Sequence, residues 1–292
     1  MSHKKAILVI AVFIYAAIAI NSVNVAYADE QNPVKHPNPP DRSVNYIGIV
    51  PYFSPDKIWH FFQPVISYLN RASDIRWELK LYHSHDSIIN GICNCELSIA
   101  YLSPVHFAIA YKKCGIKPLL ITLAEDGKPY FRSAIITSDP GIKSLKELKG
   151  KRFAFGPKST TGAYVVPRKM LEDEGITMDM IKPVFFAGGD KIVNAVARKE
   201  VAAGAVRIGV TRIVKGFDIK TLKVSEPLLN FAFCAAPDAS HDAGRKFIDA
   251  LLRLKPLSNK DDSGIVKNWY REMRHGFMTP PESYVRDALE LY

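Results

Sequence analysis

The feature that most constrains the fold of this chain is its alternation of strand-like and helix-like segments. Short apolar runs are separated by longer amphipathic stretches, a rhythm typical of α/β proteins. Strands are predicted over residues 44–50, 77–82, 97–102, 119–123, 132–137, 152–155, 183–186, 203–206 and 221–224. Ser54-Pro55 and Ser103-Pro104 each join an N-cap residue to a first-turn proline, so helices are predicted to begin at both places.

The length of the chain indicates two lobes, because 292 residues exceed what one core holds comfortably. By the usual size of domains, residues 137–226 are predicted to form one α/β lobe and residues 44–136 with 227–292 the other. Two connecting segments, near residues 133–136 and 228–233, would then form a hinge. Ligands are expected in the cleft between such lobes.

The N-terminus has the pattern of a cleavable secretory signal. Lys4 and Lys5 precede fifteen apolar residues, 6–20, and Ala26-Tyr27-Ala28 provides a small-residue cleavage site. The apolar run is shorter than the roughly 20 residues of a spanning helix. We therefore predict that residues 1–28 are removed, that residues 29–43 form a Pro-rich arm, and that the mature chain is released into the periplasm.

The chain is basic, with 39 Lys and Arg against 29 Asp and Glu. The basic residues are scattered rather than clustered, and an exported protein rarely meets nucleic acid, so no nucleic-acid partner is expected. The positive charge is compatible with a small anionic ligand. A purely solubilising surface charge explains it equally well.

Four cysteines lie in a chain predicted to enter an oxidising compartment, at positions 93, 95, 114 and 234. A bond between Cys93 and Cys95 would be strained, so Cys114 is predicted to pair with one of them and Cys234 to be a buried thiol. The alternative is a metal site made by His83, His85, Cys93 and Cys95. The disulfide is the preferred interpretation.

A candidate anion site lies in residues 149–164, which have the pattern of a short strand, a tight turn and a helix start. Ser159, Thr160 and Thr161 fall at that start, where free backbone N–H groups and the helix dipole favour an oxyanion. Lys158 adds positive charge nearby. The alternative is that one hydroxyl only caps the helix.

The order of several short motifs resembles the phosphonate- and phosphite-binding proteins of ABC importers over nearly the whole mature chain. The segments that carry the resemblance are residues 48–52, 99–104, 130–136, 144–151, 159–162 with Pro167, and 201–206. The resemblance implies a type II periplasmic-binding fold, an ABC permease as partner, a monomer and no cofactor. It also implies that Ser159, Thr160 and Thr161 hold the anion.

Further ligand contacts follow from the same resemblance. The residues it places near the ligand are Tyr52, Tyr101, Tyr130, Ser133, His85 and Asp190. The chain departs from the family pattern where Gly189 replaces a ligand-facing histidine and Ala202 replaces an acid. Because an ammonium in a closed cleft needs a carboxylate partner, these departures count against an aminoalkylphosphonate.

Enzyme chemistry has little support in the sequence. The chain contains no nucleophile elbow, no His-Glu-x-x-His motif and no Walker lysine motif. His241-Asp242 begins a surface-like helix and is interpreted as solvated. The sequence therefore predicts a binding protein for phosphonate, phosphite or a phosphate-like oxyanion. The alternatives are a different small molecule or a sensory partner of a membrane receptor.

Overall fold

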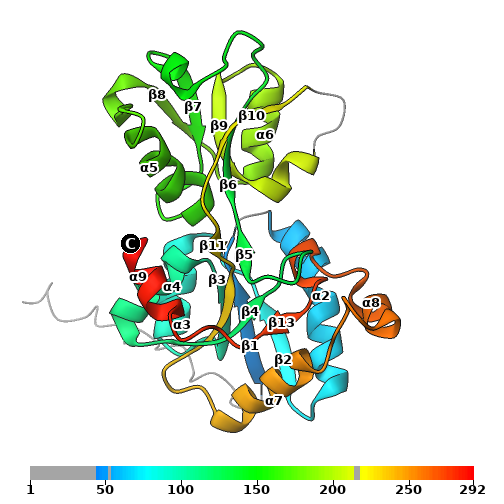
Figure 1. Cartoon of the computed structure of the whole chain (residues 1–292). Helices are drawn as coiled ribbons and strands as arrows, with labels where there is room; N and C mark the ends of the chain where they lie inside the picture. Colours follow the sequence, from blue (N-terminus) through cyan, green and yellow to red (C-terminus); the bar gives the residue numbers. More distant parts are fainter. Residues whose placement is uncertain (1–43, 52–53, 214–217) are drawn as a thin grey trace, which may run out of the picture. The chain divides into compact units, whose positions relative to one another are not determined.

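The strands of the computed structural model, which describes residues 44–51, 54–213 and 218–292, form two main sheets (Figure 1). Residues 41–292 make one compact unit. The predicted signal segment and the Pro-rich arm lie outside the described residues. So does Tyr52, one of the predicted ligand contacts.

The first sheet has six strands in the order β13-β4-β12-β3-β1-β2. Their bounds are Phe277–Met278, Lys117–Thr122, Ala232–Ala235, Ile99–Leu102, Val44–Ile49 and Arg76–Lys80. Strands β1, β2 and β3 run parallel, whereas β12 is antiparallel to both β3 and β4. The helices of this lobe are α2 (Pro55–Ala72), α3 (His85–Cys93), α4 (Pro104–Cys114), α7 (His241–Leu252), α8 (Lys260–Val266) and α9 (Tyr284–Glu290), with the 3₁₀ turn η5 (Arg271–Met273).

The second sheet has five strands in the order β10-β6-β9-β7-β8. Their bounds are Lys220–Val224, Ser133–Thr137, Ala203–Arg207, Arg152–Phe155 and Lys182–Phe185. Strands β7, β8 and β9 run parallel. Its helical elements are η1 (Leu145–Leu148), the π-helical turn η2 (Thr161–Val165), α5 (Val166–Glu172), η3 (Met178–Met180), α6 (Gly189–Ala197) and η4 (Ile208–Ile213).

The two faces of the second sheet illustrate how the sequence makes its layers. Phe153 and Phe155 of β7 pack in the core that α5 closes, whereas Ala154 between them packs against α6. Figure 1 shows α5 and α6 on opposite sides of this sheet. The two-residue period of a strand thus buries both faces, which is why β7 is apolar at three successive positions.

The chain passes between the two sheets twice, and a small antiparallel pair marks the crossing. Strand β5 (Tyr130–Phe131) pairs with β11 (Leu228–Leu229). The crossing comes slightly earlier than the predicted segment 133–136, because all of β6 pairs inside the five-stranded sheet. A sheet of two-residue strands has no periodicity that a sequence pattern could reveal.

Every predicted strand overlaps one strand of the structure, and both predicted helix starts are confirmed, with α2 beginning at Pro55 and α4 at Pro104. The segment 228–233, predicted as a connection, needs correction. Its last two residues belong to β12, a fully buried strand between β3 and β4. The short strand β13 was also not predicted. Because β12 joins its sheet from a distant part of the sequence, local pattern alone does not distinguish it from a buried connector.

Candidate functional site

A pocket of about 90 Å³ lies where the parallel strands of both sheets end. Its lining includes Val50 after β1, Ser103 after β3, Gly156 after β7, Ala187 after β8, and Arg207 at the end of β9. The carboxyl ends of strands are the usual ligand-binding edge of α/β sheets. Helices follow most of these strands, so helix N-termini also lie around the pocket.

One side of the pocket consists of helix starts, and we call it the helix-start wall. It comprises His85 on α3, Ser103 and His106 on α4, Thr160 and Thr161 at η2, and Gly188 before α6. The side chain of Ser103 caps α4 by accepting from the His106 amide. By contrast, the N-cap residues Thr160 and Gly188 make no side-chain cap hydrogen bond. The first turns of η2 and α6 therefore leave N–H groups at pocket-lining residues, an arrangement suited to an anion.

Two of the three predicted hydroxyls, those of Thr160 and Thr161, lie in this wall, and each of the three has a partner within the protein. Ser159 Oγ lies 3.1 Å from His106 Nε2, and Thr160 Oγ1 donates to the Pro157 carbonyl at 2.6 Å. The Thr161 hydroxyl accepts from the Val105 amide at 3.1 Å and donates to Ser103 Oγ at 3.2 Å. Thr160 and Thr161 line the pocket, whereas Ser159 lies behind it in a neighbouring groove. A ligand that uses these hydroxyls has to replace internal hydrogen bonds.

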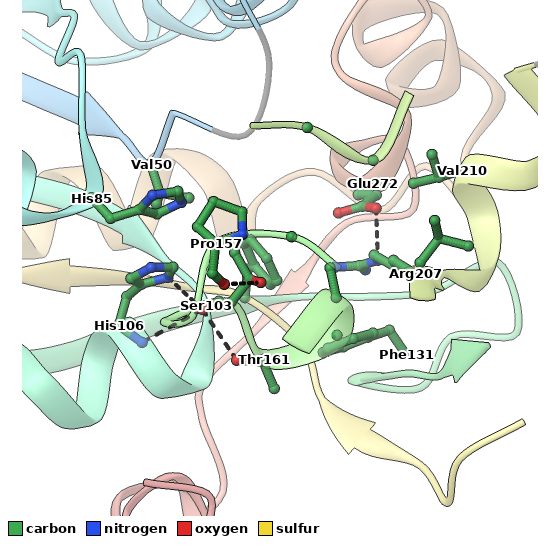
Figure 2. A pocket seen from close by; sticks show the side chains of 18 of the residues that line it. Val50, His85, Ser103, His106, Phe131, Pro157, Thr161, Arg207, Val210 and Glu272 are labelled. Carbon is green, nitrogen blue, oxygen red and sulfur yellow. Dashed lines mark hydrogen bonds and ion pairs between the residues drawn. The ribbon is translucent and has the colours of Figure 1, made fainter. Parts of the chain in front are cut away.

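The rings of two histidines stack at the N-terminal ends of α3 and α4, as Figure 2 shows. The rings of His85 and His106 are 4.5 Å apart and nearly parallel. His106 Nδ1 lies 2.6 Å from Ser103 Oγ, whereas His85 Nε2 is buried without a hydrogen-bond partner among the described residues. Burial lowers the pKa of both imidazoles, and the neighbouring His85 lowers that of His106 further. Both rings are therefore neutral at pH 7 and act as hydrogen-bonding groups rather than charges.

The opposite side is built around Arg207, and we call it the arginine wall. It consists of Phe131, Arg207, Phe231, Tyr270 and Glu272. Arg207 Nε forms an ion pair with Glu272 at 2.7 Å, and the two side chains are only 16% and 15% exposed. Glu272 also bonds to Tyr270, and burial raises the pKa of its carboxyl although Arg207 opposes the shift. The guanidinium lies 4.3 Å from the ring centre of Phe131 and 5.1 Å from that of Phe231.

Four of the predicted contacts lie elsewhere. Tyr101 is fully buried in the first core, where its hydroxyl lies 3.3 Å from Thr122 Oγ1. Tyr130 is 41% exposed and lines an adjoining pocket near Arg132, which shares Phe131, Arg207 and Glu272 with the first. Ser133 is buried and donates to the Gly162 carbonyl, and Asp190 pairs with Lys57 at 2.8 Å. Tyr130, Ser133 and Asp190 border the pocket-lining residues, whereas Tyr101 packs as a core residue.

The disulfide prediction is confirmed, and it removes a ligand from the metal alternative. Cys93 pairs with Cys114, and Cys234 is a buried thiol as predicted, while Cys95 is also free. Cys93 therefore offers no thiolate beside His83, His85 and Cys95. No group of three or more potential metal-binding side chains occurs in the described parts of the chain.

Sequence reasoning missed His106, Arg207 and Glu272. His106 had a usable signal, because its position three residues after the Ser103 cap places it on the first turn of α4. Arg207 and Glu272 had none, since they are 65 residues apart and meet only through the fold. An arginine that ends a buried strand is otherwise unremarkable in a basic chain.

Comparison with known proteins gives one family and several structures. A model of the family described as "ABC transporter, phosphonate, periplasmic substrate-binding protein" matches residues 47–280. The binding-protein component of a phosphonate ABC transporter from Pseudomonas aeruginosa is 16% identical, with a TM-score of 0.72 and 85% of each chain covered. PhnD1 from Prochlorococcus marinus, solved in complex with methylphosphonate, is 17% identical, with a TM-score of 0.70, 85% of this chain and 97% of that chain covered.

A more distant similarity has the same fold. The periplasmic aliphatic sulphonate binding protein SsuA from Escherichia coli is 13% identical, with a TM-score of 0.52, and the match covers 85% of this chain and 83% of that one. These structures are two-lobed type II periplasmic-binding proteins, and the predicted fold class is confirmed. Because the family model spans most of the chain, from β1 through the last strand, this protein belongs to the periplasmic substrate-binding proteins of phosphonate ABC transporters, which bind their ligands and are not enzymes.

Proposed function

We propose that this chain captures a small oxyanion, a phosphonate, phosphite or phosphate-like ion, in the pocket and delivers it to an ABC permease of the inner membrane. The observation that carries the proposal is the convergence of helix N-termini on one pocket, with the Thr160 and Gly188 starts left uncapped by side chains. Helix N-termini stabilise negative charge through free N–H groups and the helix dipole.

The size of the pocket supports a small ligand. One water molecule needs a cavity volume of at least about 10–15 Å³. A cavity of 90 Å³ therefore holds roughly six to nine atoms the size of a water molecule. Methylphosphonate, the ligand of the Prochlorococcus marinus relative, has five non-hydrogen atoms and therefore fits in this volume. The apolar residues Val50, Pro157 and Val210 on the lining would contact an alkyl substituent.

The charge balance of the site also favours attraction by dipoles over attraction by net charge. Arg207 is paired with Glu272, and the two histidines are neutral near pH 7. The anion would therefore be held chiefly by the amides of Thr161 and Gly162 and by adjacent hydroxyls. Hydrogen bonds to a charged group are worth about 1.5–3 kcal/mol each, enough for tight capture without a free cation.

The periplasmic location follows from the family, and export through residues 1–28 belongs to the proposal. No helix within residues 44–51, 54–213 and 218–292 has the length and apolarity to cross a membrane. We expect the mature monomer to begin near Asp29 and to consist of two lobes divided near the β5–β11 crossing. Sequencing the N-terminus of protein from the periplasmic fraction tests processing, and retention of residues 1–28 in membranes would contradict it.

A thermal-shift titration of the mature protein tests the ligand class. Phosphate, phosphite, methylphosphonate and sulfate are compared, and binding at about 100 times the dissociation constant should add about 2.7 kcal/mol of stability. Gly189→Leu is the control, because the added side chain points toward pocket-lining Val210 and should fill the space. Stabilisation of the wild type and not of this variant supports the proposal, whereas no response to any anion contradicts it.

A further inference from the structure

Arg207 has three guanidinium nitrogens, and only two of them have partners. Nε pairs with Glu272 at 2.7 Å, and Nη2 donates to Asn230 Oδ1 at 2.6 Å. Nη1 is buried and has no hydrogen-bond partner among the described residues. A buried donor without an acceptor is unfavourable, the more so when it is charged, so a ligand atom is the natural acceptor for this nitrogen.

The guanidinium is held in place and directed at the pocket. Phe131 and Phe231 pack against it, and the Glu272 and Asn230 bonds fix two of its three nitrogens. Figure 2 shows Arg207 reaching from the end of β9 into the pocket, opposite Thr161 and Pro157. An arginine fixed in this way offers its remaining donor to an incoming oxygen at little further entropic cost.

The same wall provides nothing to neutralise an ammonium group. Glu272 is the only acid among the described residues that line the pocket, and its carboxylate is already paired with Arg207 and bonded to Tyr270. Asp190, beside the lining residue Gly189, is paired with Lys57. An aminoalkyl substituent would bury its charge without a partner, which is strongly unfavourable.

We propose that Arg207 determines ligand specificity, and that its Nη1 donates a hydrogen bond to a carboxylate oxygen at the end of the ligand remote from the helix-start wall. The inference rests on the proposed function and narrows its ligand class to small carboxyalkylphosphonates. The phosphonate would lie at Thr160 and Thr161 and the carboxylate at Arg207.

The test compares two ligands of equal size and different ends. Phosphonoacetate carries a carboxylate where isobutylphosphonate carries an isopropyl group, and both keep the phosphonate. Titration calorimetry of the mature wild-type protein should give phosphonoacetate a ten- to hundredfold lower dissociation constant, because one charged hydrogen bond is gained. 2-Aminoethylphosphonate should bind more weakly than isobutylphosphonate.

Variants assign this preference to Arg207. The double variant Arg207→Met, Glu272→Gln removes the ion pair without leaving one charge buried. Arg207→Lys keeps the positive charge but loses the planar guanidinium and its paired donors. Both should lower the preference for phosphonoacetate to threefold or less, while isobutylphosphonate binding shows that the proteins are folded. Arg132→Met is the matched control, since Arg132 donates to the Ser225 carbonyl and does not line the pocket. It should leave the preference intact.

The outcomes separate this inference from the proposed function. If isobutylphosphonate binds as tightly as phosphonoacetate, or if the preference survives in both Arg207 variants, the role of Arg207 is overturned and the oxyanion pocket remains. If the wild type binds no phosphonate, phosphite or phosphate at all, the proposed function fails and this inference with it.

Discussion

The two walls of the pocket differ in how they are built and in what they leave open. The helix-start wall comes from short strand–turn–helix segments, and its hydroxyls are satisfied by near or facing residues such as Pro157 and Val105. The arginine wall joins β9 to Glu272 and leaves one guanidinium nitrogen unpartnered. The first wall suits any oxyanion, whereas the second makes distinctions among its substituents. General affinity and specificity thus reside in different parts of the fold.

The largest expected effect on stability comes from breaking the ion pair of the arginine wall. Glu272→Ala leaves Arg207 buried without its partner and should cost about 3–5 kcal/mol of unfolding free energy, because the pair is largely removed from water. Urea unfolding measures this loss. Glu78→Ala is the control, since its pair with Arg76 is exposed and should be worth less than about 1 kcal/mol. Equal losses of unfolding free energy in the two variants would show that the buried Arg207–Glu272 pair contributes no more to stability than the exposed pair does.

The next effect concerns the helix-start wall. The Cys93–Cys114 disulfide joins the C-terminal ends of α3 and α4, whose first turns carry His85 and His106. Cys93→Ser with Cys114→Ser should lower the unfolding free energy by about 3 kcal/mol, because the bond closes a loop of 21 residues. Denaturant titration checks it, with the free thiol variant Cys95→Ser as control. A double variant as stable as that control would contradict the expectation.

The difference between the walls also explains which parts of the fold could be predicted. Strands such as β7 and β9 were predicted because several apolar residues in a row lie between turn residues. Strand β12 was not, because its place between β3 and β4 is fixed by residues far away in sequence. Strands of two residues, such as β5 and β13, leave no pattern at all.

The same division applies to the site. Thr160 and Thr161 were predicted from a local motif, and they line the pocket. Arg207 and Glu272 could not be predicted, because neither residue has a neighbour in sequence that marks it. Tyr101 shows the opposite error, since an aromatic residue before a helix start is as compatible with core packing as with ligand contact, and here it packs in the core. Site residues that belong to a local motif can be predicted from a sequence, whereas residues that the fold brings together from two lobes cannot.

A smaller effect sharpens the role of the helix-start wall. Thr160→Ala removes a donor at the start of η2. Because this hydroxyl has to leave the Pro157 carbonyl to reach a ligand, oxyanion binding should weaken by at most roughly ten- to a hundredfold, the value of one hydrogen bond to a charged group. Calorimetry beside thermal unfolding measures it. Ser240→Ala, at the N-cap of α7 and outside the pocket lining, should cost about 1 kcal/mol of stability and no affinity. If Thr160→Ala behaves like Ser240→Ala, the hydroxyl serves only the local structure.

The smallest effect is a pH dependence of stability that comes from the helix-start wall. Burial lowers the pKa of His106 well below its usual value, so the unfolded chain takes up this proton at a higher pH than the folded protein does. The contribution of His106 is therefore fully present above the unfolded pKa of about 6.5 and is lost as the pH falls below it, by at most about 1.4 kcal/mol per pH unit.

His106→Gln isolates this term when unfolding free energies of the variant and the wild type are compared from pH 7.5 to 5. The raised pKa of Glu272 acts with the opposite sign, because its contribution is lost as the pH rises through the folded pKa. That term and those of the surface carboxylates are common to both proteins and cancel in the difference. His85 remains in the variant, and its pKa is lowered by burial and raised by Asp86, so its contribution is also common to both proteins. The variant should therefore lose less stability than the wild type below pH 6.5, and parallel curves would mean that His106 is not kept neutral by the fold.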